Sequence, residues 1–185
     1  MSSATRLYLS NDTSARAAGA GWLADAWADR PEVQLIRLSS RGAFFLEPMV
    51  ERDGSDGRVA WFNVTPEDLP SILAGTGGTP VQAIPYLANQ TRVTFANFGE
   101  TEPLALDEYQ ARGGLVGLEE AFRLTPEAII EELRISQLRG RGGAAFPVWN
   151  KWKVAQQTKA REKYVVANAD EGDAGTYCDR MILEG

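Results

Sequence analysis

The chain has 185 residues, a formal net charge of −6, one cysteine and no histidine. The absence of histidine excludes Ser/His catalysis and zinc sites that need imidazole, and the single Cys178 excludes an internal disulfide. No apolar run is long enough to span a bilayer, and the N-terminus lacks the apolar stretch of a signal peptide. We therefore expect a cytoplasmic globular protein without a membrane segment.

Residues 1–90 predict a compact α/β domain. Strands at 6–10 and 33–37 enclose a helix that Asp12 or Thr13 could cap, and this order favours a parallel pair of strands. One apolar face of that helix is expected to contain Ala15, Ala18, Trp22, Leu23, Ala26 and Trp27. Stretches 43–51 and 58–64 flank DGSDG and predict a hairpin. Thr65-Pro66 then begins another helix, which completes a thioredoxin-like β-α-β-β-β-α order.

Residues 91–125 show little regular periodicity and are interpreted as a linker or collar. Thr125-Pro126 predicts the start of an amphipathic helix, and a second such helix is expected at about 148–160. The run KYVVAN at 163–168 predicts a buried strand. Because the chain stops without a helix-ending signal, we expect residues 126–185 to be a truncated domain.

A basic glycine loop lies between these two helices. Residues 134–163 contain eight basic residues and one acid, so they carry +7 and the remainder of the chain carries −13. Gly140, Gly142 and Gly143 are expected to allow positive φ and a close ligand, and the following helix N-terminus would favour a phosphate that Lys151 could reach. A plain helix–helix connection with a glycine cap remains the alternative. An arginine–glycine nucleic-acid tether is disfavoured, because RGRGG occurs once in an acidic chain.

An acidic turn follows the predicted strand. Asn168, Asp170, Glu171 and Asp173 offer oxygen acceptors for ribityl or ribose hydroxyls at the carboxyl end of that strand. A calcium loop is excluded because its sixth position should be glycine and is aspartate. A solvated acidic turn is the alternative. Phe146 is a candidate for stacking on a planar ligand, or it packs in the core.

The motifs LRGRGGAAFP-x3-KW and VVANADEGDAGTYCDR together resemble a family of FMN-carrying, NADH-oxidising subunits. Its members are the flavin subunit of complex I and the diaphorase subunits of NAD-reducing hydrogenases and soluble NAD-dependent formate dehydrogenases. Residues 101–133 resemble the collar of that family. The front domain, residues 1–90, is most similar to the corresponding domain of the formate dehydrogenase diaphorase subunits.

The resemblance implies a Rossmann-like FMN-binding α/β domain that begins at residue 126 and continues beyond Gly185, where a [4Fe–4S] cluster would lie. The residues implied for FMN are Gly140, Arg141, Gly142, Gly143, Lys151, Asn168, Asp170 and Glu171, and those implied for NAD are Phe146 and Asp173. The flavin would pass electrons from NADH to iron–sulfur clusters, with no catalytic side chain and no metal ligand in this part.

The sequence departs from the family at two places. In and after the loop, Ala145 stands where the family has its last glycine, and Val148-Trp149-Asn150 stands where Thr-Gly-Leu is common. The positions of the four cysteines in cluster-binding relatives are occupied by Ser10, Ala15, Ser40 and Phe44. None of these side chains is a thiolate, so we expect no [2Fe–2S] cluster in the front domain.

The resemblance favours a diaphorase subunit of a formate dehydrogenase. Its partners would be a molybdenum or tungsten alpha subunit and a small [2Fe–2S] subunit, without nucleic acid. The alternatives are a flavin subunit of hydrogenase or complex I type and, in another class, a non-catalytic assembly module.

Overall fold

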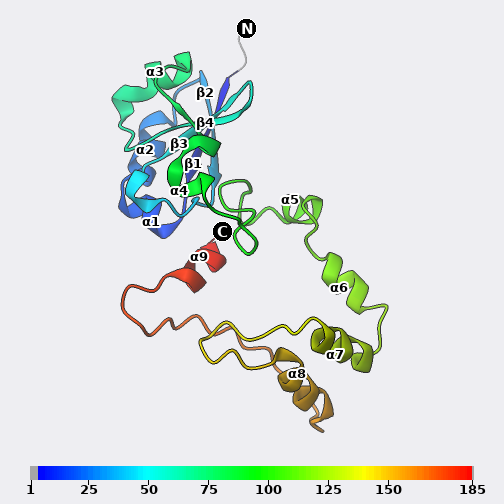
Figure 1. Ribbon diagram of the computed structural model, residues 1–185. Coiled ribbons are helices and arrows are strands. Elements are labelled where there is room, and N and C mark those ends of the chain that lie inside the picture. The colour runs from blue at the N-terminus through cyan, green and yellow to red at the C-terminus, as the bar shows by residue number, and fades with distance from the viewer. Residues whose placement is uncertain (1–3, 185) are drawn as a thin grey trace. The chain divides into compact units, whose positions relative to one another are not determined.

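The computed structural model describes residues 4–184 (Figure 1). These residues form two compact units. The first unit comprises the residues up to Glu108 together with those from Ala169 onward, and the second comprises Tyr109–Asn168.

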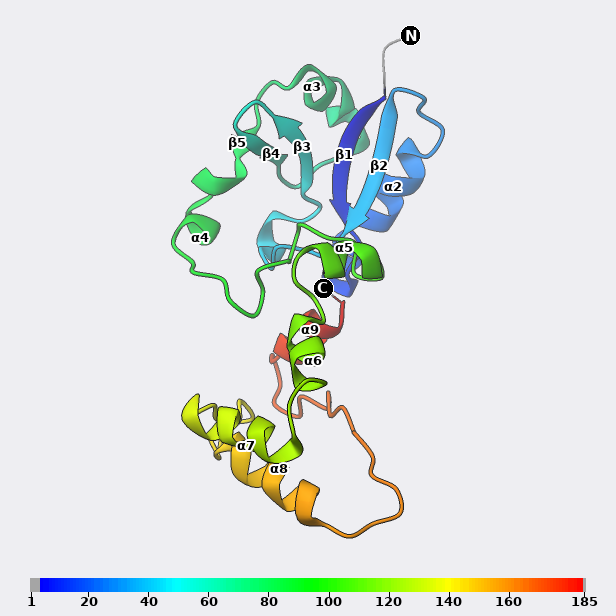
Figure 2. The same cartoon turned by 90° about the vertical axis from the view of Figure 1, so that its right-hand side faces the viewer.

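A five-stranded mixed sheet forms the centre of the first unit, which confirms the α/β class. Its strands are β1 Thr5–Ser10, β2 Val33–Leu38, β3 Val50–Gly54, β4 Gly57–Trp61 and β5 Thr79–Pro80, in the order β2-β1-β3-β4-β5. The predicted parallel pair is confirmed, because Leu7 of β1 is in register with Leu35 of β2. The remaining pairs are antiparallel, and the predicted hairpin closes where Gly54 faces Gly57. Figure 2 shows β1 beside β2, with α2 next to them.

The helix between β1 and β2 is broken in two. Helix α1 spans Thr13–Ala17 and α2 spans Ala20–Trp27, and Gly19 between them has φ +108°. Asp12 caps α1 by accepting a hydrogen bond from Ala15 N at 2.7 Å. Trp22 and Trp27 both belong to α2, where their spacing places them on nearly opposite faces, so Trp27 is buried while Trp22 is 64% exposed. The prediction of one continuous apolar face was therefore wrong at Ala18, Trp22 and Ala26, which are exposed.

The first arm of the hairpin is shorter than predicted. Phe44–Leu46 forms a 3-10 turn, the Glu47–Pro48 peptide is cis, and β3 begins only at Val50. Pro48 has no N–H to donate to a sheet ladder, so the expected strand at 43–51 cannot pair along its first half.

Helix α3, Leu69–Ala74, completes the core of the first unit. The predicted start is confirmed, because Thr65 and Asp68 form a capping box ahead of the helix. Leu69 and Ile72 are buried against the sheet. The remaining helices of this part of the chain are α4 Pro85–Ala88, α5 Leu106–Ala111, which crosses the boundary between the units, and α9 Cys178–Glu184.

The segment that follows α4 is tied to the sheet. Arg58 Nη1 donates to Gly99 O at 2.6 Å, and Gly99 N donates to Ser39 Oγ at 3.0 Å. Phe98 and Thr101 are buried. Residues 98–101 thus belong to the packed structure of the first unit.

The second unit contains α6 Val116–Ala121, α7 Pro126–Ile135 and α8 Val148–Gln157. The predicted Thr125 cap is confirmed, because its hydroxyl accepts from Ala128 N at 3.2 Å. Helices α7 and α8 lie side by side (Figures 1 and 2), and Gln156 Nε2 donates to Glu127 at 2.7 Å. Within residues 4–184, no helix is long and apolar enough to cross a membrane.

The predicted strand at 163–168 is not formed. These residues are extended without strand pairing, and Val165 and Val166 are almost fully exposed. A strand is stabilised by hydrogen bonds to a neighbouring strand. The described residues supply none here, so the apolar sequence alone does not produce one.

Candidate functional site

The glycine loop connects α7 and α8 as a closed hairpin-like turn. Gly140 N donates to Phe146 O at 2.8 Å, and Val148 N donates to Leu138 O at 3.0 Å. Arg139 Nη1 also donates across the base of the loop to Ala145 O at 3.1 Å. These bonds hold residues 140–146 as a defined protrusion ahead of α8.

Only part of the predicted backbone geometry is present in this loop. Gly143 has φ +103°, whereas Gly140 and Gly142 lie outside the positive range, so one of the three glycines uses the conformation that all three allow. Ala145 takes the left-handed conformation instead, with φ +51°. A Cβ added at Gly142 or Gly143 would meet no protein atom within 4 Å. The side of the loop on which side chains of residues 142 and 143 would lie is therefore open.

The N-terminus of α8 directly follows this loop and has no side-chain cap. Its N-cap residue is Pro147, and no side chain there accepts a hydrogen bond from the first turn. Uncapped N–H groups and the helix dipole favour an anion at such a position. Lys151, at the start of the same helix, places Nζ 5.8 Å from the ring centroid of Phe146, which is 45% exposed. A cation, an aromatic face and an uncapped helix end are thus brought together.

The acidic turn has a different local role from the one expected. Glu171 Oε1 accepts from Asp179 N at 2.7 Å and Oε2 accepts from Arg180 N at 3.3 Å, so this carboxylate caps α9. Glu171 itself is in the left-handed region, with φ +44°. Asp173 closes the following turn by accepting from Thr176 N through its backbone oxygen at 3.1 Å.

The predicted site residues are divided between the two units. The loop residues Gly140–Phe146, together with Lys151 and Asn168, belong to the second unit. Asp170, Glu171 and Asp173 belong to the first. That the loop and the acidic turn share one ligand stays a prediction.

Comparison with known proteins places both motifs in a single domain family. Residues 133–185 match the family described as the Nuo51 FMN-binding domain. This stretch contains every residue that the sequence predicted for the site.

The relatives of the chain include subunits of hydrogenases and of NADH-quinone oxidoreductases. It is 44% identical to the NADP-reducing hydrogenase subunit HndC of Solidesulfovibrio fructosivorans, over 52% of this chain and 19% of that protein. It is 48% identical to an NADH-quinone oxidoreductase subunit of Aquifex aeolicus, over 43% of this chain and 18% of that protein. It is 36% identical to the NAD-reducing hydrogenase HoxS subunit alpha of Cupriavidus necator, over 62% of this chain and 18% of that protein. The aligned stretches thus cover about a fifth of the length of these relatives.

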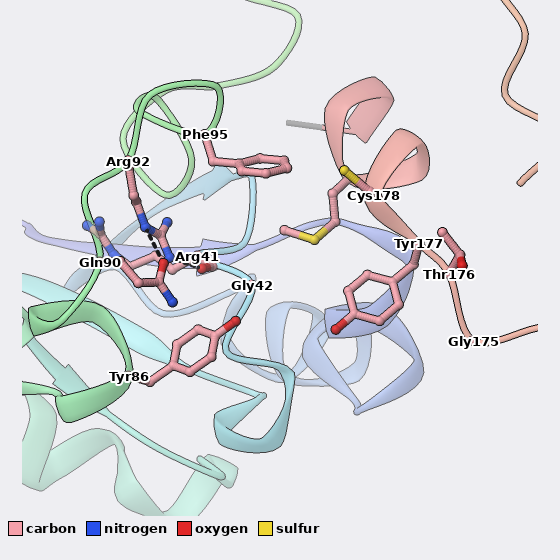
Figure 3. A pocket seen from close by; sticks show the side chains of 11 residues that line it. Arg41, Gly42, Tyr86, Gln90, Arg92, Phe95, Gly175, Thr176, Tyr177 and Cys178 are labelled. Carbon is pink, nitrogen blue, oxygen red and sulfur yellow. Dashed lines mark hydrogen bonds between the residues drawn. The ribbon is translucent and has the colours of Figure 1, made fainter. Parts of the chain in front are cut away.

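A cavity of about 390 Å³ in the first unit lies partly outside the Nuo51 match. Figure 3 shows Tyr86, Arg92 and Phe95 on one side of it, with Tyr177 and Cys178 on the other. Arg92 donates to Arg41 O at 2.6 Å. Burial, followed by the charge of Arg41, lowers the pKa of Arg92. Sequence reasoning missed this cavity, because no local pattern indicates that Tyr86 and Tyr177 line the same space.

Proposed function

We propose that the second unit and the acidic turn form the FMN-binding part of an NAD-linked flavoprotein oxidoreductase. The observation that carries this proposal is the uncapped N-terminus of α8 beside the open backbone of Gly142 and Gly143. This arrangement suits a phosphate group. It lies within the residues that match an FMN-binding family.

Each predicted residue then has a defined task. Backbone N–H groups of Arg141, Gly142, Gly143 and Trp149 would bind the phosphate, while Gly140 N and Val148 N keep the loop closed. Arg141 and Lys151 would neutralise the charge of the phosphate. The exposed ring of Phe146 would pack against a planar ring of NAD.

The acidic turn would bind the other parts of FMN and NAD. Asn168, Asp170 and Glu171 would accept hydrogen bonds from the ribityl chain and the flavin ring, and Asp173 would lie towards NAD. For Glu171, this role requires that its carboxylate accept these bonds while keeping those to α9, which its remaining lone pairs allow. When bound, FMN supplies hydride acceptance from NADH and one-electron release, while the protein holds and orients the two ring systems.

We place this activity in a complex of the hydrogenase or complex I type, because the named relatives are subunits of such enzymes. Electrons would leave through iron–sulfur clusters of the longer polypeptide or of partner subunits. A formate dehydrogenase context, with a molybdenum or tungsten alpha subunit and a small [2Fe–2S] subunit, is a second proposal. It is supported by the resemblance of the front domain.

The front domain is proposed to be thioredoxin-like and to bind no [2Fe–2S] cluster. The strand order β2-β1-β3-β4, with one parallel pair, supports the first part. The side chains at Ser10, Ala15, Ser40 and Phe44 support the second, because none is a thiol. We propose that this domain ends near residue 90 and that 91–125 form its collar, of which residues 98–101 pack against the domain.

Flavin binding by the purified chain tests the proposal. We expect the chain to quench FMN fluorescence, and we expect Gly142→Val to weaken binding at least about tenfold, because a branched side chain would occupy the open side of the loop. Lys151→Ala should weaken binding by a similar factor through the loss of a charge-assisted hydrogen bond.

Gly117→Val is the matched control. Gly117 also has no neighbour within 4 Å of an added Cβ, but it lies in α6, outside the FMN-binding match. Binding that is unchanged in Gly142→Val, or reduced equally in Gly117→Val, would remove the loop from the proposed site. A chain that takes up no flavin at all would favour the assembly module.

A further inference from the structure

Helix α9 is held at both of its ends by side chains that accept hydrogen bonds. It has seven residues, and isolated helices this short are not stable in water. Glu171 caps its N-terminus through Asp179 N and Arg180 N. At its other end, Glu184 accepts from Thr13 N at 3.0 Å and from the Thr13 hydroxyl. The helix therefore depends on partners outside itself.

Thr13 is the first residue of α1, so its N–H has no partner within that helix. Glu184 satisfies this donor, while the Asp12 side chain satisfies Ala15 N further along the first turn. The end of α9 thus completes the capping of α1, although these residues are far apart in sequence.

A second set of contacts lies at the start of α9. Arg180 Nη2 donates to Ser14 Oγ at 2.7 Å. The rings of Phe44 and Tyr177 meet edge to face, with centroids 5.1 Å apart, and the Arg180 guanidinium lies 5.9 and 5.8 Å from their centroids. Met181 packs against Gly42, where an added Cβ would come within 2.9 Å of its Cε.

We propose that the face of the front domain formed by Thr13, Ser14 and Phe44 is a clamp that holds α9 and thereby positions the acidic turn. The connection runs through named bonds within the first unit. The front-domain face holds α9, the first N–H groups of α9 hold both carboxylate oxygens of Glu171, and Glu171 lies inside the turn. This assigns a positioning function to a domain for which we propose no cluster.

The clamp has a consequence for ligand binding, and this part rests on the proposed function. The left-handed conformation of Glu171 is unfavourable for a residue with a side chain and persists only where surrounding contacts impose it. Releasing α9 would remove these contacts and let the turn relax. The affinity for FMN would then fall in proportion to the fraction of molecules in which the turn is still held.

Hydrogen exchange of the amides in residues 178–184 of the full chain tests the clamp directly. Ser14→Ala and Arg180→Gln should each accelerate exchange there roughly tenfold, because each removes one partner of a charge-assisted hydrogen bond. The double variant should add little beyond Arg180→Gln, because Ser14→Ala removes only the hydrogen bond to Arg180, whereas Arg180→Gln also removes the guanidinium near Phe44 and Tyr177. Ser55→Ala, at the distant β3–β4 turn, is the control and should leave this exchange unchanged.

Two outcomes overturn the clamp. Unchanged exchange in both variants, in chains whose circular dichroism is native, would show that the face does not hold α9. Accelerated exchange with an unaltered FMN dissociation constant in the double variant would show that α9 does not position the turn. We expect that constant to rise about threefold or more. If the wild-type chain binds no FMN, the proposed function fails, and the exchange measurements still decide whether the clamp exists.

Discussion

Arg41 and Glu51 form a buried bidentate ion pair on the sheet of the first unit. Arg41 Nε lies 2.5 Å from Glu51 Oε1, and Nη2 lies 2.9 Å from Oε2. Their side chains are only 10% and 5% exposed. Burial lowers the pKa of Arg41, but the hydrogen bonds and charges of Glu51 and Glu100 outweigh it, so the pKa is raised and the guanidinium stays charged. This pair, with Glu100 2.7 Å from Arg41 Nη2, ties the segment after α4 to the sheet.

Removing one charge of this pair should destabilise the first unit strongly. Glu51→Gln leaves the buried guanidinium of Arg41 without its main counter-ion, and breaking such a pair costs about 3–5 kcal/mol. We expect the midpoint of urea unfolding, followed by tryptophan fluorescence, to fall accordingly.

The exposed pair of Glu131 and Arg134 is the matched control. It is also bidentate, at 2.6 and 2.7 Å, but both side chains are about half exposed to solvent. Glu131→Gln should leave the urea midpoint unchanged, because water and salt screen such pairs. Equal effects of the two substitutions would contradict the importance of burial.

Glu47 should make stability depend on pH. Its carboxylate accepts from Ser10 Oγ at 2.9 Å and from Met49 N at 2.8 Å. Burial is the largest influence and raises its pKa to about 7, with Asp12 and Glu51 adding to the rise and the two hydrogen bonds opposing it. Because the folded pKa lies above the unfolded value, the folded state binds the proton more tightly. The free energy of unfolding should therefore fall as the pH rises from about 4.5 to 7, by up to about 3 kcal/mol.

Glu47→Gln tests this directly, because an amide cannot ionise. We expect the variant to lose this part of the pH dependence and to exceed the wild type in stability at pH 8. Urea unfolding at several pH values between 5 and 8 provides the measurement. A variant with the same pH slope as the wild type would assign the dependence to other groups.

The sequence predicted the local features of the fold well, because those features depend on residues close together in the chain. Asp12, Thr65 and Thr125 cap helices as expected, and the DGSDG turn joins two strands. The break at Gly19 was not predicted, since Ala15 to Trp27 follows a helical period on both sides of it. Only the packing of Trp27 under the sheet shows which face is buried.

Part of the candidate site also follows from residues that are close together in the chain. The loop beside Lys151 and Phe146 follows from a contiguous motif, and the structure brings these residues together. The capping role of Glu171 depends on α9, and α9 depends on contacts with Thr13 and Ser14 at the other end of the chain. No pattern within either segment indicates this pairing.

Trp22 and Trp27 should differ sharply in their effect on stability. Trp27 is 2% exposed and belongs to the core, whereas Trp22 is 64% exposed. Trp27→Ala should reduce the free energy of unfolding by about 3–5 kcal/mol through a large cavity. Trp22→Ala should change it by less than about 0.5 kcal/mol. Equal losses in urea unfolding would mean that the two faces of α2 are buried alike, contrary to the structure.

The loop offers a last test, which separates backbone conformation from ligand contact. Gly143 has φ +103° and Ala145 has φ +51°, while Gly142 lies outside the positive range. A residue with a Cβ in the left-handed region costs about 1–2 kcal/mol. Gly143→Ala should therefore destabilise the second unit by about that amount, and Ala145→Gly should stabilise it slightly. Gly142→Ala should be close to neutral without ligand, because its Cβ meets no protein atom.

Hydrogen exchange of the α8 amides measures these differences for the second unit alone. If Gly142→Ala is neutral in this experiment yet weakens FMN binding, the open side of the loop is where the ligand lies. If Gly143→Ala is as neutral as Gly142→Ala, the left-handed conformation at 143 is not maintained in solution. The loop would then lack the preformed backbone on which the proposed phosphate site depends.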